Sequence, residues 1–532
     1  MIRNPVLKGF NADPSFLRVG EDYYLAVSTF EWYPGVQIHH SRGLVNWRLV
    51  SRPLDREALL DMRGNADSCG VWAPCLSHDG ERFWLVYTDV KRLDGNFKDA
   101  HNYITCSETI DGPWSDPWYV NSSGFDPSLF HDDDGRKWFV NQQWNHRGPG
   151  TGGNPAHASF DGILLQEWSP EEGLIGEAEN IFPGSDRGLT EAPHLFKRDG
   201  YYYLTTAEGG TGYDHAVTMA RSRDIHGPYE LHPETHLIST KGTQGPIQRT
   251  GHGQYVETHW GDHYHSFLMG RPMPGRDGTG RYCPMGRETG LEKVVWKDGW
   301  LWLEEGGTVP RTEVPAPVDV APEPEVAIDY GFDAGLPMDF QWLRTPAPER
   351  IFRTGDGALT LFGRESLGSW FEQALVARRQ EHFAYTAETE VDFAPTTYQQ
   401  AAGLTTYYNR HKFHALLVTD EPGIGRVLTI LSCPGDWPEQ RLSMPAEPVA
   451  LADGPVEMRV VVDHAEQQFW YRQGGDWQPF GPALDASVIS DEGGRGEHAS
   501  FTGAFVGMVA MDTSGRGREA RFSRFRYAPA GT

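Results

Sequence analysis

Three carboxylic acids occur in similar short motifs far apart in the sequence. Asp13 and Asp126 each precede Pro-Ser, and Glu191 precedes Ala-Pro. Such acids, brought together, could hydrolyse a glycosidic bond, because one carboxylic acid protonates the leaving oxygen while one carboxylate activates water. A third carboxylate nearby would raise the pKa of the acid by repulsion between like charges. Each Asp-Pro pair alone is more typical of a turn, but the three motifs together favour a catalytic site.

Two further residues could take part in such a site. His252 lies between two glycines, and Arg287 lies in the polar segment Gly-Arg-Glu-Thr-Gly. An imidazole could contact a sugar or bind a cation, and a guanidinium fork could bind vicinal hydroxyls or a carboxylate. The pattern leaves open whether His252 is a packed polar residue and whether Arg287 belongs to a surface ion pair.

The elements that must position these residues form a weak internal repeat. The acidic motifs, a Trp-Ala-Pro motif around Ala73 and His252 follow one another at intervals of 53 to 65 residues. An aromatic strand pattern follows each motif about ten residues later, with hairpin-type acidic–glycine pairs in between. Units of this length have room for four strands, so five units predict a five-bladed β-propeller. Unrelated hairpins in a sandwich are the alternative, but the matching offsets favour the propeller.

A propeller would explain how distant acids could meet. The first strand of each blade lines the central channel, so motifs at the start of successive units converge on one axis. The pattern therefore predicts that Asp13, Asp126 and Glu191 face a single pocket.

The repeat also predicts the domain organisation of an all-β chain. We expect a five-bladed β-propeller over residues 1–308 and a proline-rich linker over residues 309–326. Alternating short strands predict a β-sandwich domain over residues 327–532.

Composition and charge exclude several classes of partner. The 532 residues carry a formal net charge of −26, whereas nucleic acids and anionic membrane surfaces both need a basic footprint. The longest apolar stretch is far too short to span a bilayer, and the first ten residues lack the apolar core of a secretory signal. The five cysteines are not in CxxC spacing and predict reduced thiols. We therefore expect a cytoplasmic protein with no nucleic-acid or membrane partner.

Several motifs, in order, resemble glycoside hydrolase family 43, and most closely its two-domain β-xylosidases. They are Gly-Phe-Asn-Ala-Asp-Pro-Ser at residues 9–15, Trp-Ala-Pro at 72–74, Phe-Asp-Pro-Ser-Leu-Phe at 125–130, Thr-Glu-Ala-Pro-His-Leu at 190–195 and Gly-Arg-Glu-Thr at 286–289. The resemblance spans nearly the whole chain, including the C-terminal sandwich.

The resemblance implies roles for the three acids. Asp13 is then the general base, Glu191 the general acid, and Asp126 the residue that tunes the pKa of the acid and orients it. The implied activity is single-displacement, inverting hydrolysis that releases xylose from the non-reducing end of β-1,4-xylo-oligosaccharides. No cofactor would be required.

The resemblance also implies the walls of the pocket. Arg287 would bind hydroxyls of the terminal xylose, between Phe30 and Trp72. An aromatic residue of the sandwich would close the mouth, with Phe501 as the first candidate and Phe505 as the second.

Two expectations concern His252 and one loop. The resemblance places His252 at the axial histidine of the family, which contacts substrate and in some members holds a divalent cation, such as calcium, through water. A Gly-rich segment at residues 148–155 looks longer than usual for the family and leaves the preference for the leaving group open.

Three other activities compete with this interpretation. An α-L-arabinofuranosidase, alone or as a second activity, would present similar hydroxyls to the pocket. Fructan-cleaving enzymes combine the same two folds, but their opening has Asn-Asp-Pro-Asn where this chain has Ala-Asp-Pro-Ser. A sugar-binding propeller without catalysis would not need three converging acids.

The oligomeric state stays open, and a homo-oligomer is compatible with the sequence.

Overall fold

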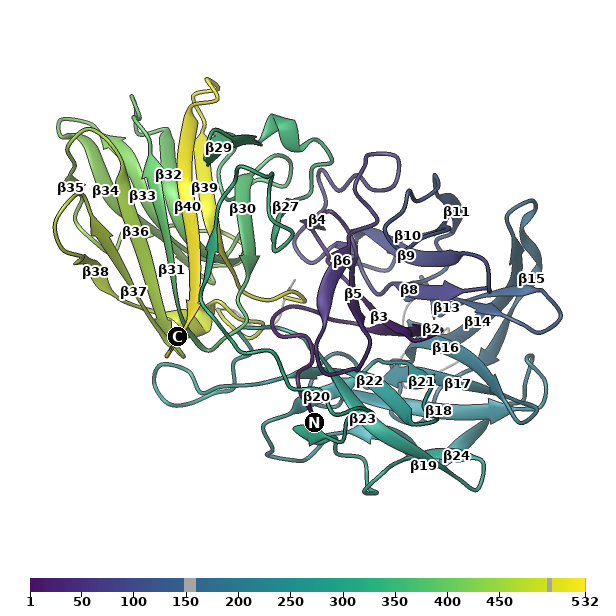
Figure 1. Cartoon of the computed structure of the whole chain (residues 1–532). Helices are drawn as coiled ribbons and strands as arrows, with labels where there is room; N and C mark the ends of the chain where they lie inside the picture. The colour runs from purple at the N-terminus through teal and green to yellow at the C-terminus, as the bar shows by residue number, and fades with distance from the viewer. Residues whose placement is uncertain (148–158, 495–499, 532) are drawn as a thin grey trace.

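The computed structural model describes residues 1–147, 159–494 and 500–531, and its regular elements are almost all β-strands (Figure 1). Within these ranges the helices are two short 3-10 turns, η1 (Pro348–Arg350) and η2 (Ala486–Val488). None of the described helices is long and apolar enough to cross a membrane. The expected all-β class is confirmed.

The N-terminal half folds into five blades, each an antiparallel sheet of four or five strands. The strands are β2 (Ser15–Val19), β3 (Asp22–Val27), β5 (Gln37–Ser41) and β6 (Arg48–Ser51) in blade 1; β7 (Gly70–Val71), β8 (Cys75–His78), β9 (Phe83–Arg92), β10 (Asp99–Ser107) and β11 (Trp118–Asn121) in blade 2; β12 (Ser128–His131), β13 (Lys137–Trp144), β14 (Phe160–Ser169) and β15 (Gly173–Phe182) in blade 3; β16 (Glu191–Arg198), β17 (Tyr201–Glu208), β18 (Ala216–Ser222) and β19 (Glu230–Ser239) in blade 4; and β20 (Gln248–Gly251), β21 (Tyr255–Glu257), β22 (His263–Gly270), β23 (Glu288–Lys297) and β24 (Trp300–Leu303) in blade 5. The predicted five-bladed propeller is confirmed.

The early strands of neighbouring blades touch one another around the centre of the propeller. Strand β8 contacts both β2 and β12, and β12 contacts β16. Residues at the starts of these strands therefore lie near one axis, as the repeat predicts.

Aromatic side chains fill the space between neighbouring blades. Trp84 of blade 2 packs edge-on against Trp168 of blade 3, with ring centroids 5.8 Å apart. Tyr203 of blade 4 packs in the same way against Trp296 of blade 5 at 5.0 Å. Such aromatic pairs contribute packing beyond their buried area.

The N-terminal segment closes the ring between blades 5 and 1. The side chain of Asn4 donates to the carbonyl of Leu291 and accepts from its amide, both at 2.8 Å. Leu7 forms a β-bridge with Thr289.

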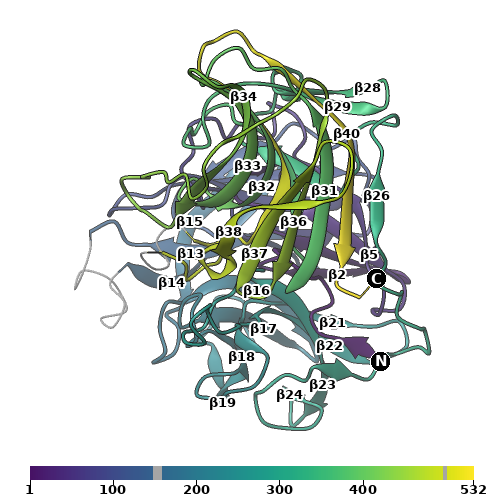
Figure 2. The same cartoon turned by 90° about the vertical axis from the view of Figure 1, so that its left-hand side faces the viewer.

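The C-terminal half is a sandwich of two eight-stranded sheets (Figure 2). One sheet contains β26 (Ile328–Tyr330), β28 (Phe352–Gly355), β29 (Ala358–Phe362), β31 (Ala384–Asp392), β36 (Val456–Asp463), β37 (Glu466–Arg472), β38 (Gln478–Asp485) and β40 (Glu519–Pro529). The other contains β4 (Trp32–Tyr33), β27 (Phe340–Leu343), β30 (Ala374–Arg379), β32 (Gln400–Asn409), β33 (Lys412–Glu421), β34 (Gly425–Pro434), β35 (Val449–Ala450) and β39 (Phe505–Asp512).

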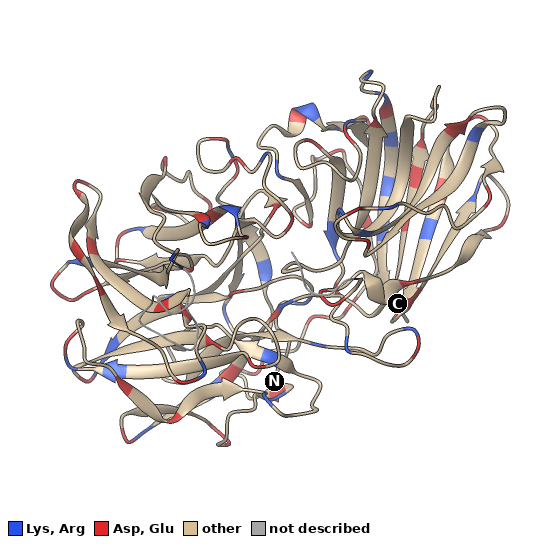
Figure 3. Ribbon diagram, turned by 180° about the vertical axis from the view of Figure 1, so that it is seen from behind, with Lys and Arg blue, Asp and Glu red and all other residues tan. Residues whose placement is uncertain are grey.

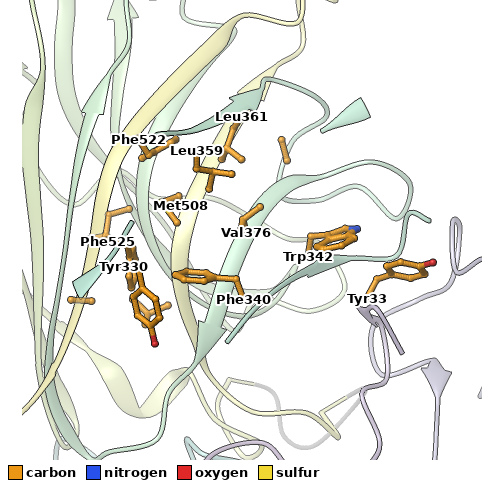
Figure 4. Packing of buried hydrophobic residues seen from close by; sticks show 14 of the residues in the cluster. Tyr33, Tyr330, Phe340, Trp342, Leu359, Leu361, Val376, Met508, Phe522 and Phe525 are labelled. Carbon is orange, nitrogen blue, oxygen red and sulfur yellow. The ribbon is translucent and has the colours of Figure 1, made fainter. Parts of the chain in front are cut away.

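The core of the sandwich lies between these sheets (Figure 4). Phe340 and Met508 from one sheet meet Leu359 and Phe525 from the other, and all four are buried. The alternating burial of β31 and β36 is the period-2 pattern of strands with one buried face.

The two domains share a sheet rather than merely touching. Strand β4 comes from the propeller sequence but pairs with β27 of the sandwich, so that Tyr33 lies opposite Trp342 (Figure 4). The ring of Trp32 stacks on Phe505 with centroids 3.6 Å apart. This pairing fixes the orientation of the sandwich relative to the propeller.

The proline-rich segment at residues 309–326 lies against the propeller. Strand β25 (Glu313–Val314) pairs with β1 (Ile2–Arg3). Farther along, the side chain of Asn46 donates to the carbonyl of Ala321 and accepts from the amide of Glu323, both at 2.9 Å. The segment therefore reaches the sandwich along blade 1.

Acidic and basic residues are interspersed along the strands and loops of both domains (Figure 3). The charge of −26 is thus spread over the molecule rather than gathered on one domain.

Replacing Trp32 by Ala should lower the free energy of unfolding by about 3–5 kcal/mol, because a fully buried ring that joins both domains is lost. Denaturant titration followed by circular dichroism measures this change. Tyr398→Ala is the control, since Tyr398 is 67% exposed, and it should change the same free energy by less than about 0.5 kcal/mol. Equal effects of the two substitutions would contradict the packing described for β4.

Candidate active site

A pocket of about 250 Å³ lies at the centre of the propeller and is closed on one side by the sandwich. Eight of the nine residues singled out from the sequence line it: Asp13, Phe30, Trp72, Asp126, Glu191, His252, Arg287 and Phe501. A second cavity of about 780 Å³ lies between blade 1, the proline-rich segment and the sandwich, and the three acids do not line it. The smaller pocket is therefore the candidate active site.

The backbone at the starts of blades 1, 3, 4 and 5 is held in the left-handed conformation. The φ angles are +58° at Asp13, +53° at Asp126, +52° at Ala192 and +34° at His252. Residues other than glycine rarely adopt this region, and such strain clusters at functional sites. In blades 1, 3 and 5 the left-handed residue is the motif residue itself, in blade 4 it is the residue after Glu191, and in blade 2 Ala73 does not have this conformation.

Asp13 is buried and held by two donors. Ser28 Oγ donates to Asp13 Oδ2 at 2.7 Å, and Arg287 Nη1 donates to Asp13 Oδ1 at 2.8 Å. His252 Nδ1 is 3.6 Å from the same Oδ1 atom. A charge-assisted bond from a guanidinium favours the carboxylate form, which is the form that a base needs.

Glu191 and Asp126 are buried in the same pocket and favour their protonated forms. Burial, and then the negative charge of Asp13, raise the pKa of Glu191 to about 8 against the opposing charges of Arg287 and Lys98. The pKa of Asp126 is raised well above its ordinary value, first by burial and then by the charges of Glu191 and Asp13. A carboxylic acid that keeps its proton near neutral pH can donate it to a leaving group.

Arg287 connects the acids with the sandwich. Its Nη2 donates to the carbonyl of Phe501 at 3.0 Å, while Nη1 holds Asp13. The guanidinium carbon lies 5.3 Å from the centroid of the Phe30 ring.

Aromatic rings form the wall around these polar groups. Phe501 lies 6.4 Å, centroid to centroid, from both Phe30 and Trp72, so a residue of the sandwich meets two residues of the propeller. Phe505 is instead fully buried against Trp32 and does not line the pocket. Of the two candidates for the aromatic at the mouth, only Phe501 is in place.

His252 belongs to a group of buried imidazoles at the axis. Burial, with a smaller effect of Arg287, lowers the pKa of His252 to about 3, so the ring is neutral. His215 also lines the pocket, and its two ring nitrogens have no hydrogen-bond partner among the described residues. Within the described parts of the chain, no group of three His, Cys, Asp or Glu residues is placed to hold a metal ion.

Several pocket residues had no signal in the sequence. Lys98 Nζ lies 4.2 Å from the centroid of the Trp144 ring, and burial lowers the pKa of this lysine. Lys98 belongs to no repeated motif, and Trp144 lies at the far end of its strand. The Gly-rich segment at residues 148–155 lies outside the described residues.

Comparisons with known proteins cover both domains. The profile of Glycosyl hydrolases family 43 matches residues 2–301, and the profile of the Beta xylosidase C-terminal Concanavalin A-like domain matches residues 330–528. The chain is 55% identical to Xylosidase/arabinosidase 43B of Humicola insolens, over 99% of this chain and 98% of that protein. It is 48% identical to Beta-xylosidase of Bacillus subtilis (strain 168) over 99% of both chains. The crystal structure of xylan beta-1,4-xylosidase from Bacillus halodurans C-125 superposes with a TM-score of 0.93 at 46% identity, over 99% of this chain and 100% of that chain.

Replacing Asp13 by Asn should lower the pKa of Glu191 from about 8 towards that of an ordinary carboxyl. The substitution removes the negative charge beside Glu191 but keeps the shape of the side chain at position 13. Carbon-13 NMR titration of protein labelled at the glutamate carboxyls measures this, with the signal assigned from Glu191→Gln. Asp22→Asn, in a surface pair with His40, should leave the pKa of Glu191 unchanged. An unchanged value in Asp13→Asn would show that the two carboxyls do not interact.

Proposed function

Because the chain belongs to family 43 of the glycosyl hydrolases, whose enzymes invert the anomeric configuration, we propose that it releases xylose from the non-reducing end of β-1,4-xylo-oligosaccharides. The observation that carries this proposal is the pairing of two acids in one closed pocket. Asp13 is held by Arg287, while burial keeps a proton on Glu191. Relatives similar over the full length of the chain are named as xylosidases.

The proposed reaction is a single displacement. Water attacks the anomeric carbon from the face opposite the leaving group and gives a proton to Asp13. Glu191 gives its proton to the glycosidic oxygen as the bond between that oxygen and the anomeric carbon breaks. A β-xyloside therefore yields α-xylose, and the two carboxyls return to their starting states when protons exchange with solvent.

The remaining residues of the pocket are assigned to binding and tuning. We assign Asp126 to tuning and orienting Glu191, since the charges of these two buried acids act on each other. Arg287 would bind hydroxyls of the terminal xylose between Phe30 and Trp72, and His252 would contact the sugar from the axis. Phe501 narrows the mouth, which supports the release of single sugars from a chain end.

Hydrolysis by this family needs no cofactor. A divalent cation near the axis, with His252 as its protein ligand, stays a prediction. Since no set of three His, Cys, Asp or Glu residues in the described ranges suits a metal, most of its ligands would have to be water, and the proposed mechanism has no step through it.

An α-L-arabinofuranosidase is the second candidate activity, alone or beside the first. It is supported by the name of the relative from Humicola insolens, which combines xylosidase and arabinosidase. The two sugars present similar hydroxyls to a pocket of this kind, so one pair of acids could serve both.

A cytoplasmic location and a homo-oligomeric state are further proposals. The five cysteines are all buried as free thiols, which supports a reducing compartment. Measuring the mass in solution by light scattering would test the oligomeric state.

Xylobiose mixed with the protein should give α-xylose first, because the water attacks from the face opposite the leaving oxygen. The anomeric protons, followed by NMR during the first minutes, distinguish the two anomers before mutarotation mixes them. Early β-xylose would contradict the inverting mechanism. No cleavage of xylobiose, with cleavage of a nitrophenyl arabinofuranoside, would favour the second candidate.

Glu191→Gln should reduce kcat/KM for xylobiose by about 10²–10⁴-fold, the range typical of general-acid catalysis. In the native protein the protonated fraction of Glu191 falls as pH rises through about 8, so activity should decline on that side, and the variant should lose this alkaline limb. A pH–rate profile measures both effects. Glu171→Gln, at an exposed position, is the control and should behave like the native protein. Normal xylobiose turnover by Glu191→Gln would refute the assignment.

A further inference from the structure

A buried serine in blade 2 connects the two aromatic walls of the pocket. Ser68 is completely buried and lies just before β7, with a φ angle of +60°. Its hydroxyl oxygen accepts a hydrogen bond from the backbone amide of Phe501 at 2.9 Å. Its carbonyl oxygen accepts a hydrogen bond from the indole nitrogen of Trp72, also at 2.9 Å. One residue thus touches the propeller wall and the sandwich wall at the same time.

We propose that Ser68 is a positioning residue that sets the spacing of Trp72 and Phe501 and thereby the fit of the terminal sugar. This inference rests on the proposed function, because it concerns the same pocket. Ser68 itself does not line the pocket, so it acts through the two aromatic residues and not on the reacting atoms.

Residues of both domains form hydrogen bonds with the segment around Ser68. The amide of Ser68 donates to Glu31 Oε2 at 3.1 Å. The preceding residue, Asp67, accepts from Arg344 Nη2 at 2.9 Å and from Arg410 Nε at 3.0 Å, and both arginines belong to the sandwich. A buried carboxylate with two guanidinium partners is hard to displace, because either charge left alone would be buried unpaired. The hydroxyl of Ser68 is therefore presented from a rigid turn.

The segment that carries Phe501 is held by other hydrogen bonds as well, including one from Lys412 Nζ to Ser500 Oγ at 2.8 Å. The carbonyl of Phe501 accepts from Arg287 at 3.0 Å, and the amide of Thr502 donates to the hydroxyl of Tyr408 at 3.1 Å. Arg287 also holds Asp13, so a change there would alter the chemistry as well as the wall. The Ser68 hydroxyl, in contrast, can be removed without touching a carboxyl of the site.

Loss of the Ser68 hydroxyl leaves the amide of Phe501 without its acceptor, and the ring loses its fixed distance from Trp72. The effect should fall on binding, since none of the three acids contacts Ser68 in the described structure. We expect KM for a nitrophenyl β-xyloside and the inhibition constant of D-xylose to rise together by about five- to tenfold in Ser68→Ala, the change expected for one net hydrogen bond. The value of kcat and the alkaline limb of the pH profile should stay as in the native protein.

Hydrogen exchange gives a readout that does not depend on turnover. The backbone amides of residues 500–505 should exchange faster in Ser68→Ala than in the native protein, as measured by mass spectrometry. Ser41→Ala is the matched control, because Ser41 is also buried and its hydroxyl accepts a backbone amide at 2.9 Å, from Leu44, away from the pocket. Its KM and the exchange of residues 500–505 should not change.

Two further variants separate the hydroxyl from the backbone. Ser68→Gly removes the hydroxyl, but glycine tolerates the positive φ. If loss of the hydroxyl causes the rise in KM, Ser68→Gly should have the same KM as Ser68→Ala. If backbone strain at residue 68 causes the rise, the KM of Ser68→Gly should remain near the native value. In a double-mutant cycle, Ser68→Ala should raise KM much less when Phe501 is already Ala, because the residue through which it acts is gone.

The outcomes separate this inference from the proposed function. Unchanged exchange at residues 500–505 in both Ser68 variants, or a fall in kcat with KM unchanged, would overturn the positioning role. Faster exchange in a protein whose native form does not cleave xylosides would support the role of Ser68 in the wall and refute the proposed function alone.

Discussion

The guanidinium of Arg287 is the interaction on which the pocket depends. Three buried carboxyls share the site with two cations, Arg287 and Lys98, so the full ionisation of all three would leave one uncompensated charge in a buried region. Arg287 contacts Asp13 directly, so the negative charge is most stable there. The protons then remain on Glu191 and Asp126, whose pKa values are raised by burial and by their acidic neighbours. The division of labour between base and acid follows from the direct contact of the guanidinium with Asp13.

The same residue makes the sandwich part of the site. Arg287 also donates to the carbonyl of Phe501, and the residue before it, Gly286, has a φ of +60°. A Cβ atom on Gly286 would lie 1.7 Å from the carbonyl oxygen of Thr502, so only glycine permits this approach of the two segments. The sandwich is thus held against the pocket at a distance set by backbone contact. A rim made this way explains how an open propeller channel becomes a pocket for one sugar.

The sequence predicted the parts of this structure that repeat or that lie in motifs. The spacing of Asp13, Asp126 and Glu191 predicted the propeller, because equivalent positions of a cyclic repeat must converge. It could not predict contacts between elements that share no period, such as Ser68 with Phe501, or Lys98 beside Trp144. Lys98 and Trp144 both lie in the propeller, in neighbouring blades. The contact of Ser68 with Phe501 depends on the angle between the two domains, which is set by the β4–β27 pairing. That pairing joins two short segments with no pattern of their own, more than 300 residues apart.

The fold supplies one local geometry, and the residue placed in it decides the chemistry. Asp13, Asp126 and His252 share a left-handed backbone at the start of their units, and Ala192 has it directly after Glu191. If every blade carried the same residue at this position, the positions around the axis would be equivalent, and none would be distinguished as acid or base. Here the equivalent position of blade 2 is Ala73 and that of blade 5 is a neutral histidine, so the acid of blade 1 has no acidic position on either side, whereas the acids of blades 3 and 4 are neighbours. Arg287 contacts Asp13, the isolated acid of blade 1. The asymmetry needed for an acid and a base thus arises from residue identity on a nearly symmetric scaffold, and the sandwich adds the wall that the symmetric scaffold cannot provide.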